Sequence, residues 1–275
     1  HDKLASNVEK LSKTGIAGIV VLGSNGEGVY LSEQEKKDVI KTVVQATPKD
    51  MTVIAGTACE STAETIRLTC AGAELGAQAA LLNTPHYYGG KMTPGALIQF
   101  YSMVADAVPI PVLLYNVPKF THLTLAADTV GQLSHHPNIV GIKDSSGNLS
   151  LLGQYVNKSV ADFKVLVGTA GVLFGGLSLG GVGGVLALAN IAPQACVELY
   201  ELTRQGRYAE AKELQLRMIP VNLAVTASYG IGGLKAAMDM LGYFGGDPRL
   251  PLLPANDKDK AEIKAILAGA DLLPE

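Results

Sequence analysis

The chain has 275 residues, 48% of them hydrophobic and 17% charged, with a formal net charge of -3. This length suits one large domain or two small ones, and about 250 residues is the usual size of an α/β barrel. The charge provides no basic surface for nucleic acid or an anionic membrane. Three widely spaced cysteines, Cys59, Cys70 and Cys196, indicate neither a disulfide framework nor a zinc site.

Targeting signals are also missing from the sequence pattern. The apolar runs are broken by glycine, asparagine or proline well short of the roughly 20 residues of a membrane span. The N-terminus is polar from Asp2 onward and has no signal-peptide pattern. We expect a cytoplasmic protein, or a mitochondrial one if an N-terminal leader has been lost.

Short apolar segments alternate with helical patterns along most of the chain. Ser32 with Glu35, and Ser61 with Glu64, have the spacing of a helix capping box. Buried strands are predicted at 16–22, 51–55, 79–82, 112–115, 139–143, 164–167 and 182–186. Helices are predicted at 2–13, from Ser32 to about 46, from Ser61 to about 76, and at 94–107, 125–134, 148–157, 193–205, 207–219, 229–242 and 258–269, with a short one before 182.

Strict alternation of strands and helices implies parallel β/α units, in a doubly wound sheet or a barrel. A nucleotide-binding doubly wound protein should carry G-x-G-x-x-G after its first strand, and this chain does not. We therefore predict an α/β fold, a (β/α)8 TIM barrel over 1–205, with a C-terminal helical extension over 206–275. Only seven strands are visible, and we expect the missing first strand to precede His1, because an open barrel exposes two strand edges.

The segment 139–147, IVGIKDSSG, contains the most informative side chain. It is an apolar strand that ends on Lys143 and opens into a polar loop. Burial of an amine stabilises its neutral form, which attacks carbonyl carbons, so Lys143 is a candidate Schiff-base former. The ordinary alternative is a lysine whose stem is buried and whose ammonium lies in water.

Function in a barrel gathers at the C-terminal ends of the strands. Ser24 and Asn25, in the loop GSNGEG, offer short polar groups and backbone amides that suit a carboxylate or phosphate, although an ordinary turn looks much the same. Tyr115 ends an apolar strand, where its phenol can relay protons or fill the core. We find no spacing of metal ligands.

Three motifs in this order resemble the dihydrodipicolinate synthase / N-acetylneuraminate lyase family of pyruvate-dependent class I aldolases. They are GSNGE at 23–27, YNVP at 115–118 and GIKDS at 141–145, and the resemblance extends over essentially the whole chain. It implies that Lys143 forms the imine, that Tyr115 is the base, and that Tyr87 relays the proton from a neighbouring subunit. It further implies that Ser24, Asn25, Ser145, Gly184 and Val185 bind pyruvate, in a homotetramer without metal or organic cofactor.

Within the family the chain is most similar to 4-hydroxy-2-oxoglutarate aldolase, by its GSNGE loop, CEST at 59–62, Tyr87-Tyr88 and the glycine-rich block 180–190. We therefore expect a lyase that cleaves a 4-hydroxy-2-oxo acid to pyruvate and an aldehyde, with glyoxylate as that aldehyde. The alternatives are a 2-keto-3-deoxy sugar-acid aldolase that releases glyceraldehyde, a dihydrodipicolinate synthase, and a non-catalytic sensor of pyruvate or sugar acids. Lys119 and Phe120 stand where the family's synthases usually carry an arginine for the second substrate's carboxylate.

Overall fold

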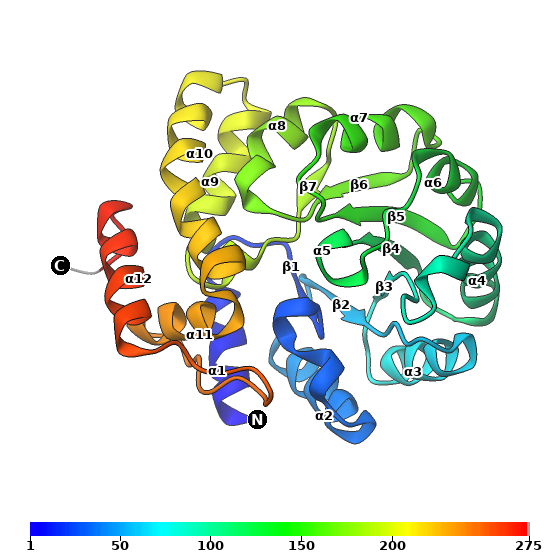
Figure 1. The fold of residues 1–275 in the computed structure, drawn as a ribbon, viewed down its shortest axis with the longest axis horizontal. Coiled ribbons are helices and arrows are strands. Elements are labelled where there is room, and N and C mark those ends of the chain that lie inside the picture. Colours follow the sequence, from blue (N-terminus) through cyan, green and yellow to red (C-terminus); the bar gives the residue numbers. More distant parts are fainter. Residues whose placement is uncertain (274–275) are drawn as a thin grey trace.

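The computed structural model describes residues 1–273, which form a curved parallel sheet with helices around it (Figure 1). The strands lie in chain order: β1 (Gly18–Val21), β2 (Thr52–Gly56), β3 (Ala79–Asn83), β4 (Val112–Asn116), β5 (Ile139–Asp144), β6 (Lys164–Val167) and β7 (Gly183–Gly184). Every neighbouring pair is parallel. This is the order of a (β/α)8 barrel, and it confirms the predicted fold class.

Helices precede the sheet or connect its strands. They are α1 (Asp2–Leu11), α2 (Glu33–Ala46), α3 (Thr62–Glu74), α4 (Pro94–Ala107), α5 (Pro118–Thr121), α6 (Ala127–Leu133), α7 (Leu149–Lys158), α8 (Leu173–Ser178) and α9 (Pro193–Arg204). Both predicted caps are present, since Ser32 and Glu35 form a full capping box and the Ser61 side chain accepts from the Glu64 amide. The short helix α5 was not predicted; its four residues are too few for a helical period.

The last strand is shorter than the sequence predicts. The pattern predicts a strand over 182–186, whereas β7 contains two residues, paired with Leu166 and Val167 of β6. Within residues 1–273 β7 pairs with β6 alone, so it lacks the second ladder that would extend it. A cavity of about 590 Å³ lies between β1 and β7.

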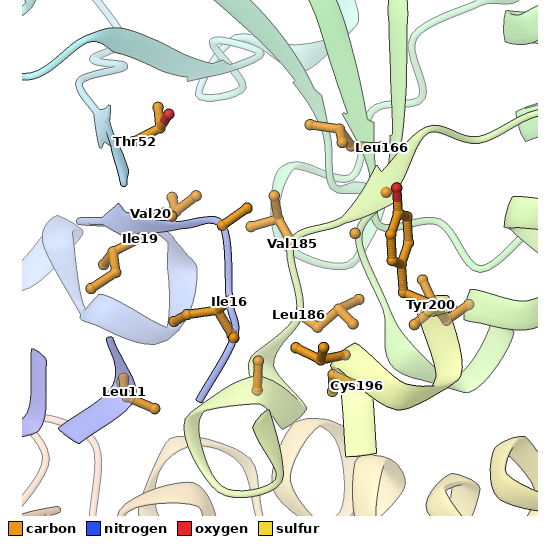
Figure 2. A pocket seen from close by; sticks show the side chains of 18 of the residues that line it. Leu11, Ile16, Ile19, Val20, Thr52, Leu166, Val185, Leu186, Cys196 and Tyr200 are labelled. Atoms are coloured by element: carbon orange, nitrogen blue, oxygen red, sulfur yellow. The ribbon is translucent and has the colours of Figure 1, made fainter. Parts of the chain in front are cut away.

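Figure 2 shows that side chains from β1, from the segment after β7 and from α9, many of them aliphatic, surround this cavity, which we call the β1–β7 cavity. Ile19 and Val20 line it from β1, Val185 and Leu186 from the segment after β7, and Cys196 from α9. The cavity separates two strands that an eight-stranded barrel would join through one further strand.

The helix α9 follows the last strand, and three more helices come after it: α10 (Tyr208–Leu223), α11 (Gly230–Met240) and α12 (Asp257–Gly269), with a π-helical turn at Ala224–Ser228 between α10 and α11. Their apolar side chains belong to the same core as the strands; Leu214, Leu234 and Ile263 are all buried in it. Residues 274–275 of the predicted extension lie outside the described residues. No helix within residues 1–273 is both long and apolar enough to cross a bilayer.

Candidate active site

Lys143 lies at the C-terminal end of β5 with its side chain inside the sheet. It is 7% exposed, and it pairs in register with Tyr115 of β4. Residues in register on adjacent strands point to the same face, and the Lys143 Nζ atom lies 4.2 Å from the centroid of the Tyr115 ring. The amine is therefore held in the interior against a phenol instead of extending into water.

Tyr115 connects this amine to the loop after β1. Its hydroxyl lies 3.2 Å from the Ser24 hydroxyl, and Ser24 begins the short 3-10 turn Ser24–Gly26 that directly follows the strand end. Burial is the largest single influence and raises the pKa of Tyr115. The positive charge of Lys143 and hydrogen bonds from side chains around Tyr115 together lower this pKa by more, so the net shift is downward. A phenol of lowered pKa gives up its proton more readily and can act as a base.

Ser145 completes the cluster from the exit of β5. Its hydroxyl donates to the carbonyl of Gly168 at 3.2 Å, and it is one of the groups that hydrogen-bond to Tyr115. A side chain at position 168 would bring its Cβ to 2.1 Å from the Ser145 Oγ, so the serine fits there because residue 168 is glycine. Four predicted site residues, Ser24, Tyr115, Lys143 and Ser145, thus meet at one end of the sheet.

A second polar pair fixes the strands that carry the amine and the phenol. Asn116 and Asp144 follow Tyr115 and Lys143, and both are almost fully buried on the opposite face of the sheet. The Asn116 amide donates to the Asp144 carboxylate at 2.8 Å, which joins β4 to β5 beyond the catalytic pair. The sequence places both at strand exits but gives no sign of this contact, which depends on strand register.

The mouth of the sheet contains a cavity of about 380 Å³, which we call the mouth cavity. Ser24 and Tyr115 line it at one side, and Val117, Phe120 and Ile231 contribute an apolar wall. Lys119 does not point a free ammonium into this space, because its Nζ donates to the carbonyl of Thr226. Of the two residues that stand where a synthase usually has a carboxylate-binding arginine, Phe120 therefore lines the cavity and Lys119 does not.

The remaining predicted residues lie apart from this cluster or only next to it. Asn25 follows Ser24 in the 3-10 turn, and Gly184 and Val185 line the β1–β7 cavity. Tyr87 is 78% exposed, in a loop whose backbone amides at His86 and Tyr87 donate to the Glu60 carboxylate. Within residues 1–273 no group of three or more histidine, cysteine or carboxylate side chains is placed to hold a metal ion.

Comparison with known proteins extends over almost the whole chain. The model of the dihydrodipicolinate synthetase family matches residues 1–270. The 4-hydroxy-tetrahydrodipicolinate synthase of Methanothrix thermoacetophila is 39% identical over 97% of this chain and 90% of its own length. The enzyme of the same name from Cereibacter sphaeroides is 35% identical over 99% and 93%.

Solved structures give the same result. Dihydrodipicolinate synthase from Acinetobacter baumannii, complexed with pyruvate, is 33% identical and superposes with a TM-score of 0.94 over 99% of this chain and 93% of that one. YagE from Escherichia coli K12, also in complex with pyruvate, is 30% identical with a TM-score of 0.91 over 98% and 91%.

These comparisons correct one expectation. Curated relatives 34–39% identical to the chain are named 4-hydroxy-tetrahydrodipicolinate synthase, which contradicts the predicted cleavage of 4-hydroxy-2-oxoglutarate. The motifs behind that prediction do not determine the aldehyde: the GSNGE loop adjoins Tyr115, and Tyr87-Tyr88 and the block 180–190 lie apart from the cluster around Lys143. With a family model matching 270 residues and relatives of this similarity, the chain belongs to the dihydrodipicolinate synthetase family.

Proposed function

We propose that the protein is a pyruvate-dependent Schiff-base enzyme that joins pyruvate to an aldehyde, the type of reaction for which its relatives are named. One observation carries this proposal: the buried Lys143 amine lies 4.2 Å from the ring of Tyr115, whose hydroxyl is within hydrogen-bond distance of Ser24. An amine, a phenol of lowered pKa and a serine hydroxyl at one strand end are the groups that imine chemistry requires.

The reaction begins when the Lys143 nitrogen attacks C2 of pyruvate. Water leaves and a protonated imine forms, which acts as an electron sink. Loss of a proton from C3 gives the enamine, and its C3 carbon then attacks the aldehyde carbon while the aldehyde oxygen takes up a proton. Addition of water to the imine releases a 4-hydroxy-2-oxo acid and restores the amine.

Tyr115 moves the protons in this sequence. Its ring lies against the amine and its hydroxyl is within hydrogen-bond distance of Ser24, which offers a proton a path away from the reacting carbon. Ser24, Asn25 and the adjacent backbone amides bind the pyruvate carboxylate, as a polar turn after a strand can do. Ser145, two residues after Lys143, adds a hydroxyl at the exit of β5.

Tyr87 reaches a site only if another subunit provides it. It and Tyr88 are 78% and 71% exposed, and their rings contact each other edge to face at 5.0 Å. Two exposed tyrosines beside the mouth of the sheet suit an interface, where this residue type is enriched. We propose that a partner subunit's copy of this loop extends the proton path, in a dimer within a homotetramer; sedimentation of the wild-type protein tests the assembly.

A second activity, aldol cleavage of a 2-keto-3-deoxy sugar acid, is favoured by the wall of the mouth cavity. Phe120 lies there and the Lys119 ammonium is bound by a backbone carbonyl, so neither residue offers a cation to a second carboxylate, and Lys36, which lines the same cavity, is the candidate left for that role in a synthase. A neutral polyhydroxylated aldehyde needs no such cation. Rates with aspartate semialdehyde and with glyceraldehyde as acceptors distinguish the two activities.

Borohydride reduction in the presence of pyruvate tests the shared first step. We expect a stable adduct on Lys143, located by peptide mass spectrometry, and no adduct in Lys143→Met, because methionine has no amine. Lys164→Met is a matched control, since Lys164 is an exposed lysine in the neighbouring strand. An unmodified Lys143 in the wild type would disprove the proposal, and an adduct without turnover on any aldehyde would indicate a sensor.

A further inference from the structure

The loop that carries Ser24 and Asn25 is bounded by two residues in an unusual backbone conformation. Leu22 has φ 61° and Glu27 has φ 55°, the left-handed region that residues with a Cβ rarely occupy. Such residues persist where the surrounding structure holds them. If Glu27 relaxed to a right-handed or extended conformation, the turn before it would rotate and Ser24 would leave Tyr115.

The Glu27 carboxylate is the group that holds this conformation. It is buried, and one of its oxygens accepts a hydrogen bond from the Arg249 amide at 2.6 Å. The other oxygen lies 2.9 Å from the Lys235 Nζ atom of α11. Both donors come from the C-terminal part of the chain, more than 200 residues away in sequence. A buried charge needs such partners, because its hydration has been lost.

Lys235 is itself fixed from several sides. Besides the carboxylate, its ammonium donates to the carbonyls of Gly245 and Asp247 at 3.3 and 3.2 Å, so all three of its N–H groups have partners. Position 245 must be glycine for this approach, since a Cβ there would lie 2.0 Å from the Lys235 carbonyl oxygen. The lysine therefore joins α11, the link after it and the loop after β1.

The Arg249 side chain secures the opposite end of the loop. Its guanidinium pairs with Glu35, the residue that completes the capping box at the start of α2. The segment between β1 and α2 is thus bound to Arg249 of the C-terminal link near its middle, at Glu27, and just beyond its end, at Glu35. Neither contact involves a residue of the catalytic cluster.

We propose that Glu27 and Lys235 are positioning residues that hold Ser24 and Asn25 in the conformation that binds the pyruvate carboxylate. The inference rests on the proposed function. It assigns a role in substrate binding to α11 and the link 243–252, which contribute no group to the imine chemistry. Their effect falls on the affinity for pyruvate, while Lys143 and Tyr115 remain in place.

Borohydride trapping as a function of pyruvate concentration tests this inference with the full-length chain. In Glu27→Gln and in Lys235→Met we expect the half-saturating pyruvate concentration to rise about tenfold, the usual effect of losing a hydrogen bond to a charged group. The rate at saturating pyruvate should change less than about threefold, because the reacting groups are untouched. The double variant should bind about as weakly as either single one, since the two residues act as a unit.

Two further variants separate positioning from general stability. Glu210→Gln makes the same chemical change in an exposed ion pair on α10 and should leave pyruvate binding unchanged. Lys235→Arg keeps the positive charge and should retain most of the affinity; Lys235→Gln replaces Lys235→Met if that variant does not fold. Unchanged half-saturation in folded Glu27→Gln and Lys235→Met, with only a lower melting temperature, would overturn the inference. Absence of any adduct in the wild type would instead overturn the proposed function.

Discussion

Two cavities of this molecule differ in size and in the groups that line them, and the smaller one contains the candidate site. The β1–β7 cavity holds about 590 Å³ between largely aliphatic walls, whereas the mouth cavity holds about 380 Å³. Of these two cavities only the smaller one is lined by Tyr115, whose ring contacts the buried Lys143, and by Ser24, which lies within hydrogen-bond distance of Tyr115. Burying an amine is costly unless it has partners, so its position is the better guide to function than the volume of a cavity.

The largest expected effect comes from removing the phenol of Tyr115. Tyr115→Phe keeps the ring under Lys143 but removes the group that transfers protons, so kcat should fall about 10²- to 10⁴-fold. The half-saturating pyruvate concentration in borohydride trapping should change far less, since the carboxylate is bound elsewhere. Steady-state rates beside trapping measure the two quantities.

Tyr101→Phe is the control for the loss of a hydroxyl in the core, because the Tyr101 hydroxyl is buried and donates to the Leu82 carbonyl. It should lower stability without lowering kcat. Equal kcat for wild type and Tyr115→Phe would show that Tyr115 has only a packing role. The mouth cavity would then lack the group proposed to transfer protons.

A smaller effect is expected on the titration of Tyr115. Its pKa is below that of an ordinary phenol in spite of burial, chiefly because the Lys143 ammonium stabilises the phenolate. In Lys143→Met this stabilisation is lost while burial remains, so the pKa must rise and the phenolate must appear at higher pH. Near-ultraviolet absorbance during a pH titration measures it.

The other tyrosines do not obscure this measurement. Burial raises the pKa of Tyr101 and of Tyr155, so both ionise after Tyr115. Subtracting the titration of Tyr115→Phe isolates the one phenol. Identical curves for wild type and Lys143→Met would mean that amine and phenol do not interact, contrary to their 4.2 Å separation.

The strand ends were predictable from the sequence because they depend on local patterns. Apolar runs and capping boxes locate β5 and α2, and polar residues after each strand identify Ser24, Tyr115 and Lys143 as neighbours at one edge. The link between Glu27 and Lys235 was not predictable, since each looks like an ordinary surface residue and they meet only in the folded chain. The predicted length of β7 was wrong for the same reason, because that length depends on a hydrogen-bonded neighbouring strand that no local sequence pattern describes.

The acceptor side shows this limit most clearly. Lys119 suggests a charge near the aldehyde, yet its ammonium donates to the Thr226 carbonyl in the turn after α10. Only the packing of the C-terminal helices against the barrel determines that Phe120, and not Lys119, lines the mouth cavity. The wall proposed for the acceptor therefore depends on tertiary contacts, while the proposed amine and phenol lie at predictable strand ends.

The smallest effect, which leaves activity unchanged, concerns Cys196 in the β1–β7 cavity. Burial raises the pKa of this thiol to about 12, so at pH 8 almost none of it is the reactive thiolate. Iodoacetamide should modify it at least about a hundredfold more slowly than the half-exposed Cys70, as followed by peptide mass spectrometry. Cys196→Ser provides the blank for its peptide. Comparable labelling of both thiols would mean that water and ions enter the β1–β7 cavity freely, and the contrast between that cavity and the one lined by the Tyr115 and Ser24 hydroxyls would no longer hold.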